Sequence, residues 1–177
     1  MNISIRRAMG IASVVSAFAV TSVVGIPSAS AQQKAGEPQK QIVGVWRLVS
    51  ALTIEKDDST TVGTFGPTPK GVFILTSSGH YASVSTHSDL PKFASGNRLQ
   101  GTAEENKAIV QGSNSHFGTY SVSPDGKVLT LKVEGGTWPH WTGNEQKREL
   151  TLAGDDMKYS LAASVGGRAT LAFKRVK

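Results

Sequence analysis

The stretch Val43-Gly44-Val45-Trp46-Arg47-Leu48 opens the first strand-like segment of the chain, and Leu171-Ala172-Phe173-Lys174-Arg175 ends the last one. The indole of Trp46 and the guanidinium of Arg175 lie near opposite ends of a β-rich chain. They can meet only if the sheet closes on itself. A guanidinium stacked on a tryptophan face contributes roughly 0.5–2 kcal/mol. The pair therefore predicts a closed β-barrel in which these two residues form a clasp at the floor.

The alternation of apolar and polar residues supports this closure, because successive side chains of a strand point to opposite faces of a sheet. Trp46 and Arg175 both fall on the more apolar face of their strands, which we expect to be the inner one. The residues that share the face of Trp46 are Leu48, Ser50, Leu52 and Ile54, and those that share the face of Arg175 are Ala169, Leu171 and Phe173.

Turn residues divide the rest of the chain into short segments joined mostly neighbour to neighbour, which is the pattern of an up-and-down barrel. A turn is expected at Lys56–Ser59, and hairpins at Ser77–Gly79, Pro124–Gly126 and Gly154–Asp156. The sequence therefore predicts an all-β fold, an eight-stranded antiparallel barrel. Its expected strands are Val43–Glu55, Gly71–Thr76, His80–His87, Phe117–Ser123, Lys127–Glu134, Glu145–Ala153, Met157–Ser164 and Arg168–Val176.

One short helix is expected between the third and fourth strands. Thr102 can cap it, and Glu105 stands three residues later as in a capping box. Ala103–Gln111 consists mostly of good helix formers, and Gly112 ends the segment. The helix would lie across the mouth or the flank of the barrel.

The N-terminal part of the chain predicts export. Residues 1–31 combine Arg6 and Arg7, an apolar stretch and the small-residue ending Ala29-Ser30-Ala31, which is typical of a cleaved signal peptide. An uncleaved membrane anchor is the alternative. Residues 32–41 are expected to form a flexible spacer before a barrel domain at 42–177. The expected location is the periplasm or the outside of the cell, with no stable membrane insertion once the leader is removed.

Composition argues against several other classes of protein. The chain has no cysteine, so it must fold without disulfides. Loss of Arg6 and Arg7 with the leader would lower its formal charge from +6 to +4. The remaining basic residues are scattered among acidic ones, whereas a nucleic-acid-binding surface would gather them with aromatic residues. We expect no nucleic-acid partner.

Polar side chains interrupt the apolar lining that the alternation predicts. Arg148 shares a face with Leu150, and His116 shares one with Tyr120. A mostly apolar pocket with a few convergent polar groups is the usual form of a small-molecule site. Arg148 could instead pair with Glu134 near the rim, and His116 could be a hydrogen-bonded structural histidine. The candidate ligand contacts are Tyr81, His116, Tyr120, Trp141 and Arg148.

The segment 135–143 places Trp138 and Trp141 in a loop bounded by glycine and proline. Loop aromatics outside a periodic face often close a barrel end, as a plug or as a gate for a ligand. In either case we expect both tryptophans to be substantially buried.

Ten short motifs stand in a defined order along the chain: Gly44–Ser50, Phe65–Pro67, Gly71, Thr76–Tyr81, Lys92–Gly96, Gly101–Glu105, Phe117–Tyr120, Trp138–Trp141, Gly143–Arg148 and Phe173–Arg175. In this order they resemble the bacterial lipocalin-like domain family. The resemblance covers Ile42–Lys177 and implies a small barrel with a central cavity for a hydrophobic or amphipathic molecule. It also implies that Trp46 and Arg175 pack at the closed end as structural residues.

Three classes of function remain open from the sequence. The leading hypothesis is an exported protein that binds a small hydrophobic or amphipathic molecule inside the barrel. A small barrel enzyme of the isomerase, cyclase or hydratase type would use His116 with Tyr120, or Arg148 with Glu134, for proton transfer. An envelope interaction or inhibitor protein would have a plugged barrel. The chain has no phosphate loop, nucleophile elbow or zinc-protease motif, and its histidines are widely spaced, so no cofactor or metal is expected.

Overall fold

The computed structural model describes residues 36–54, 60–63, 65–163 and 167–177. The predicted leader, the start of the predicted spacer and the expected turn at Lys56–Ser59 lie outside the described residues. The elements are α2 (Glu37–Ile42), β1 (Gly44–Ile54), β2 (Thr60–Val62), β3 (Lys70–Leu75), β4 (His80–Thr86), the 3-10 helix η1 (Arg98–Gln100), α3 (Ala103–Gln111), β5 (Ser113–Val122), β6 (Val128–Gly136), the 3-10 helix η2 (Pro139–Trp141), β7 (Glu145–Ala153), β8 (Asp156–Ala162) and β9 (Arg168–Arg175).

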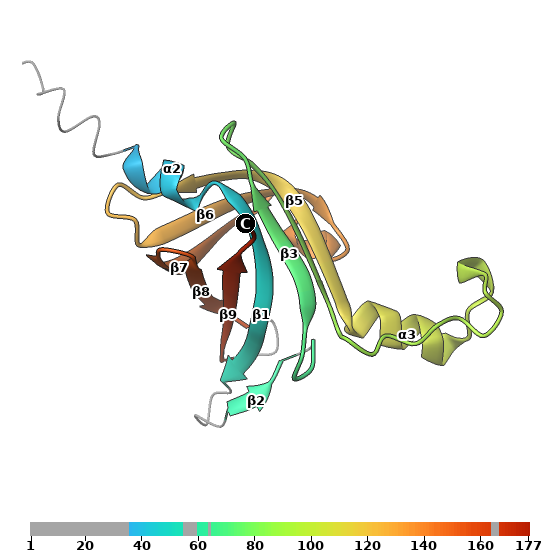
Figure 1. Ribbon diagram of the computed structural model, residues 1–177. Helices are drawn as coiled ribbons and strands as arrows, with labels where there is room; N and C mark the ends of the chain where they lie inside the picture. The colour runs from blue at the N-terminus through green and yellow to red at the C-terminus, as the bar shows by residue number, and fades with distance from the viewer. Residues whose placement is uncertain (1–35, 55–59, 64, 164–166) are drawn as a thin grey trace, which may run out of the picture.

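The strands form one antiparallel sheet in the order β2-β1-β3-β4-β5-β6-β7-β8-β9, and β1 also pairs with β9. The ring of β1 and β3 to β9 is therefore closed, with eight strands, as the sequence predicts. In Figure 1 the first strand, in turquoise, runs beside the last one, in dark red. Strand β2 is an addition that the sequence does not predict. It pairs with the Leu52–Ile54 end of β1, while β3 pairs with the Gly44–Arg47 end.

The two ends of the barrel differ in their connections. Short turns join β3 to β4, β5 to β6 and β7 to β8 at one end, and α2 lies across that end. The opposite end has the longer connections, including α3, which reaches out beyond the barrel in Figure 1. Helix α3 has the predicted bounds and the predicted capping box, because the Thr102 side chain accepts from the Glu105 backbone N–H and Glu105 accepts from the Thr102 N–H.

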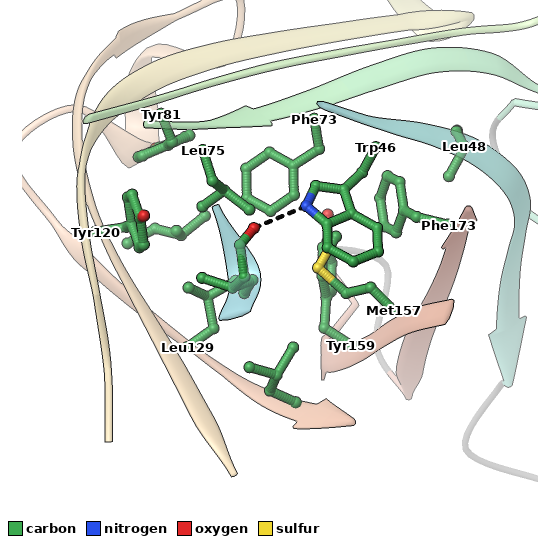
Figure 2. Close-up of a cluster of buried hydrophobic side chains, with 13 residues drawn as sticks. Trp46, Leu48, Phe73, Leu75, Tyr81, Tyr120, Leu129, Met157, Tyr159 and Phe173 are labelled. Atoms are coloured by element: carbon green, nitrogen blue, oxygen red, sulfur yellow. Dashed lines mark hydrogen bonds between the residues drawn. The ribbon is translucent and has the colours of Figure 1, made fainter. Parts of the chain in front are cut away.

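The core fills the closed end, where the inward side chains of the barrel strands meet (Figure 2). Trp46 and Phe73 are completely buried and belong to one cluster with Tyr159 and Phe173. The inner faces of β6 and β8 are apolar, since Leu129, Leu131, Val133 and Met157 are all buried. Burial of such side chains stabilises the fold by about 1.5–3 kcal/mol each.

The predicted parity of the first strand, meaning which alternate residues face inward, is wrong beyond Leu48. The register of β1 against β9 shifts between Leu48 and Ser50, which is the mark of a β-bulge. The bulge turns Ala51 inward, where it is 5% exposed, and leaves Leu52 40% exposed. The extra residue at the bulge thus reverses which residues of β1 face inward in the half of the strand beyond Leu48.

The predicted flexible spacer is also wrong for its C-terminal part, because α2 occupies Glu37–Ile42. Pro38 stands in the first turn of this helix, where a proline costs no hydrogen bond. Ile42 is completely buried in the core, and the Gln39 Oε1 accepts from the backbone N–H of Val122. Helix α2 therefore covers the closed end of the barrel.

Candidate functional site

The closed end holds the predicted clasp. The Arg175 guanidinium lies 4.1 Å above the centre of the Trp46 ring, which confirms the stacking. The Trp46 indole N–H donates to the Ile42 carbonyl at 2.8 Å, the bond drawn in Figure 2. Arg175 donates to the carbonyls of Val43 and Gln41 at 2.7 and 2.6 Å. These bonds attach α2 to the barrel, so the clasp is structural.

A cavity of about 140 Å³ occupies the open half of the barrel. Its lining is mixed. Apolar residues of β1, β8 and β9 face polar residues of β4, β5 and β7. The lining residues that matter for its chemistry are Ser83, Ser85, Asn114, His116 and Arg148 on the polar side, Ala51, Leu161, Ala169 and Leu171 on the apolar side, and Trp141 of η2.

Arg148 is the most unusual residue of this cavity. It is 2% exposed, and its guanidinium carbon lies 4.5 Å from the centre of the Tyr159 ring. Its Nε atom is buried without a hydrogen-bond partner. Within the described residues no carboxylate lies within ion-pair distance of Arg148, so the alternative of a pair with Glu134 near the rim is wrong. Tyr159 provides stacking but no compensating charge.

His116 joins the cavity to a second buried group. One of its ring nitrogens, Nδ1, lies 3.0 Å from the Tyr81 hydroxyl. The His116 ring also packs edge to face on Trp141, with 5.3 Å between the ring centres. Burial, together with the positive charge of Arg148, lowers the pKa of His116 from 6.5 to about 3. Burial raises the pKa of Tyr81 to about 12, partly opposed by Arg148. Both groups are therefore neutral near pH 7.

The structure thus brings four of the five candidate contacts together. His116, Trp141 and Arg148 line the cavity, and Tyr81 stands behind His116. Tyr120 is the exception, because its hydroxyl donates to the Thr76 carbonyl at 2.7 Å at the closed end. The proposed pairing of His116 with Tyr120 is wrong for the same reason, and Tyr81 takes that place.

Sequence reasoning missed two residues of the site. Asn114 belongs to β5, which begins at Ser113 rather than at the expected Phe117, so its inward position was hidden in a presumed loop. Phe65 reaches the cavity from the irregular connection before β3, where no periodicity exists to predict it. The composition Phe65-Gly66-Pro67 gave the only signal.

A larger groove of about 700 Å³ lies outside the cavity at the open end. Its walls come from the segment before α3, from α3 itself and from the loop that contains Trp138. Phe65, Asn114 and Trp141 line both the groove and the cavity, so they form the boundary between the two. Trp138 is 45% exposed on the groove, which makes the expectation of two buried loop tryptophans wrong for this one.

The chain belongs to the lipocalin-like domain family, which it matches over residues 43–175. No curated protein matches it. Among solved structures, a redesigned β-barrel shares 14% identity at a TM-score of 0.40, covering 79% of this chain and 96% of that one. A de novo designed fluorescence-activating β-barrel shares 10% identity at a TM-score of 0.39, covering 78% and 96%.

Two absences concern the described residues alone. They contain no group of three or more His, Cys, Asp or Glu side chains that could hold a metal ion. No helix among them is long and apolar enough to cross a bilayer.

Proposed function

We propose that this protein is an exported binding protein for a small hydrophobic or amphipathic molecule, held in the open half of its barrel. The observation that carries the proposal is the cavity of about 140 Å³ with apolar walls and a few convergent polar groups. Ligand sites of drug-sized molecules measure about 300–1,000 Å³. The cavity alone therefore suits a compact molecule, and a longer one would extend past Trp141 into the outer groove.

Export to the periplasm or the medium is the second part of the proposal. It rests on the sequence of residues 1–31, whose basic start, apolar stretch and small-residue ending are typical of a signal peptide. Determination of the N-terminal residue of the protein recovered from cell fractions tests it. We expect a chain that begins at Gln32 outside the cytoplasm, and a full-length cytoplasmic chain would contradict it.

The enzyme alternative loses support from the electrostatics of the cavity. A general acid or base works best when its pKa lies near the operating pH. The pKa of His116 near 3 and that of Tyr81 near 12 lie far on either side of neutrality. The exposed Trp138 favours an interaction protein, but this residue lies in the wall of the same groove that adjoins the cavity.

Native mass spectrometry of the protein purified from its host tests the binding function. We expect a retained small molecule. Tryptophan fluorescence gives a second readout, because Trp141 adjoins the cavity while Trp46 is sealed in the core. Ligand should change the emission of the parent and of the Trp138→Phe control, and the change should be small in Trp141→Phe. A protein without bound molecule and without response to a panel of hydrophobic and amphipathic compounds would refute the proposal.

A further inference from the structure

The charge balance of the cavity points beyond a generic apolar ligand. A buried charge is costly unless it is paired and hydrogen-bonded. Arg148 is 2% exposed and stacked on Tyr159, and its Nε has no partner. No carboxylate of the described residues lies within ion-pair distance of it. The guanidinium hydrogen-bonds the neutral Tyr159 side chain, but its Nε–H is an unused donor in a residue that lines an open cavity.

We propose that the ligand is an amphipathic organic carboxylate, whose carboxylate group binds the guanidinium of Arg148 and whose apolar body lies along the opposite wall toward Trp141. This inference rests on the proposed binding function and specifies the chemical class of its ligand.

The number of charges favours a single negative charge on the ligand. Apart from Arg148, the one basic side chain of the cavity lining is His116, which is neutral near pH 7. One guanidinium balances a monoanion, whereas a phosphomonoester carries a charge of about −1.5 to −2 at pH 7. A carboxylate is also planar and fits the guanidinium fork with two parallel hydrogen bonds. Ser83 and Ser85, each 5% exposed, add hydroxyl groups to the same side of the lining.

The apolar part of the ligand has a complementary surface. Ala51, Ala169 and Leu171 line the cavity from β1 and β9. Leu52 also lines this space, but Ala51, which the bulge in β1 turns inward, is the more buried of the two residues. Beyond them, Phe65 and Trp141 line both the cavity and the outer groove, so a chain too long for the cavity would extend past these residues into the groove.

Calorimetric titration with three probes of equal chain length tests the inference: octanoate, octan-1-ol and octanamide. A hydrogen-bonded charge pair in a water-poor site favours the charged ligand by about 10- to 100-fold. We expect octanoate to bind the parent protein more tightly than either neutral probe by about that factor. If the neutral probes bind as well as octanoate, the inference fails while the binding function stands. If none of the three binds and no molecule co-purifies, the binding function itself fails.

Substitution of Arg148 provides an independent test of the inference. Arg148→Met should weaken octanoate binding by about 10- to 100-fold and leave octan-1-ol binding unchanged. Without ligand its Tm should equal or exceed that of the parent, because an uncompensated buried charge is removed. Arg148→Lys, which keeps the charge but loses the fork, should bind octanoate less tightly than the parent. Arg47→Met is the control, since it removes the same charge from an exposed position of β1. Undiminished octanoate binding by both Arg148 variants would overturn the inference.

Discussion

The buried His116 should make the stability of this protein depend on pH in a defined window. Its pKa is about 3 in the folded state, because burial and the charge of Arg148 disfavour the imidazolium, against 6.5 for an exposed histidine. Between these two values the unfolded chain binds the proton and the folded chain does not. The contribution of His116 to the free energy of unfolding should therefore be fully retained above about pH 6.5. It should decrease as the pH drops toward about 3.

The size of the effect follows from linkage. One proton corresponds to about 1.36 kcal/mol per pH unit, so His116 alone should lower the free energy of unfolding by about 2.5 kcal/mol between about pH 7 and about pH 4.5. His116→Gln removes the titrating ring and keeps a side-chain amide near the Tyr81 hydroxyl. This variant should lose most of that pH dependence.

The assay is urea unfolding followed by circular dichroism at several pH values in this window, with m-values fitted at each. Hydrogen bonds lower the carboxyl pKa values of Asp125 and Asp155, and the His116→Gln variant retains both groups, so its difference from the parent isolates the contribution of His116. His80→Gln, at an exposed position of β4, is the control and should keep the pH dependence of the parent. A His116→Gln variant with the same slope as the parent would refute the assignment of the effect to His116.

Three further substitutions test the fold. Trp46→Ala should lower the free energy of unfolding by about 3–5 kcal/mol in urea unfolding at pH 7, because the indole is completely buried; a loss below about 1 kcal/mol would contradict the clasp. Gly118→Ala should lower the free energy of unfolding by about 1–3 kcal/mol or more in the same assay, since the added Cβ would stand 2.0 Å from the Lys132 carbonyl oxygen. Gly36→Ala is the control for this variant and should have little effect, because no atom lies within 4 Å of its added Cβ. Thr102→Ala removes the cap of α3 and should lower the hydrogen-exchange protection of that helix by about 1 kcal/mol; unchanged protection would show that the cap does not stabilise it.

Much of the fold follows from local patterns in the sequence. The parity of Trp46 and Arg175 was sufficient to predict closure, because both lie in regular parts of their strands. The bounds of α3 followed from the capping box and Gly112, which act over a single turn. The parity of Leu52 was wrong because a bulge is a matter of register between two strands, and one strand alone does not reveal it.

The site was harder to predict, since parity gives the face of a residue but not its height in the barrel. Arg148 and His116 were correctly expected inside, yet Tyr120, on the same face as His116, lies at the closed end. Arg148 has no carboxylate partner among the described residues, and this could not be predicted because the neighbours of Arg148 are set by the arrangement of all the barrel strands. The inward position of Phe65 depends on the path of an irregular connection, for which sequence provides no period.

The most direct measurement is the ¹H–¹⁵N spectrum of the arginine side chains during titration with octanoate. The Arg148 Nε–H signal, identified by its loss in Arg148→Lys, should move on addition of octanoate and much less with octan-1-ol, because the Nε is buried next to the cavity without a partner. The signal of Arg47, on the outer face of β1, should stay unchanged in both titrations. An Arg148 signal that does not respond to octanoate, while the probe binds elsewhere on the protein, would contradict the account.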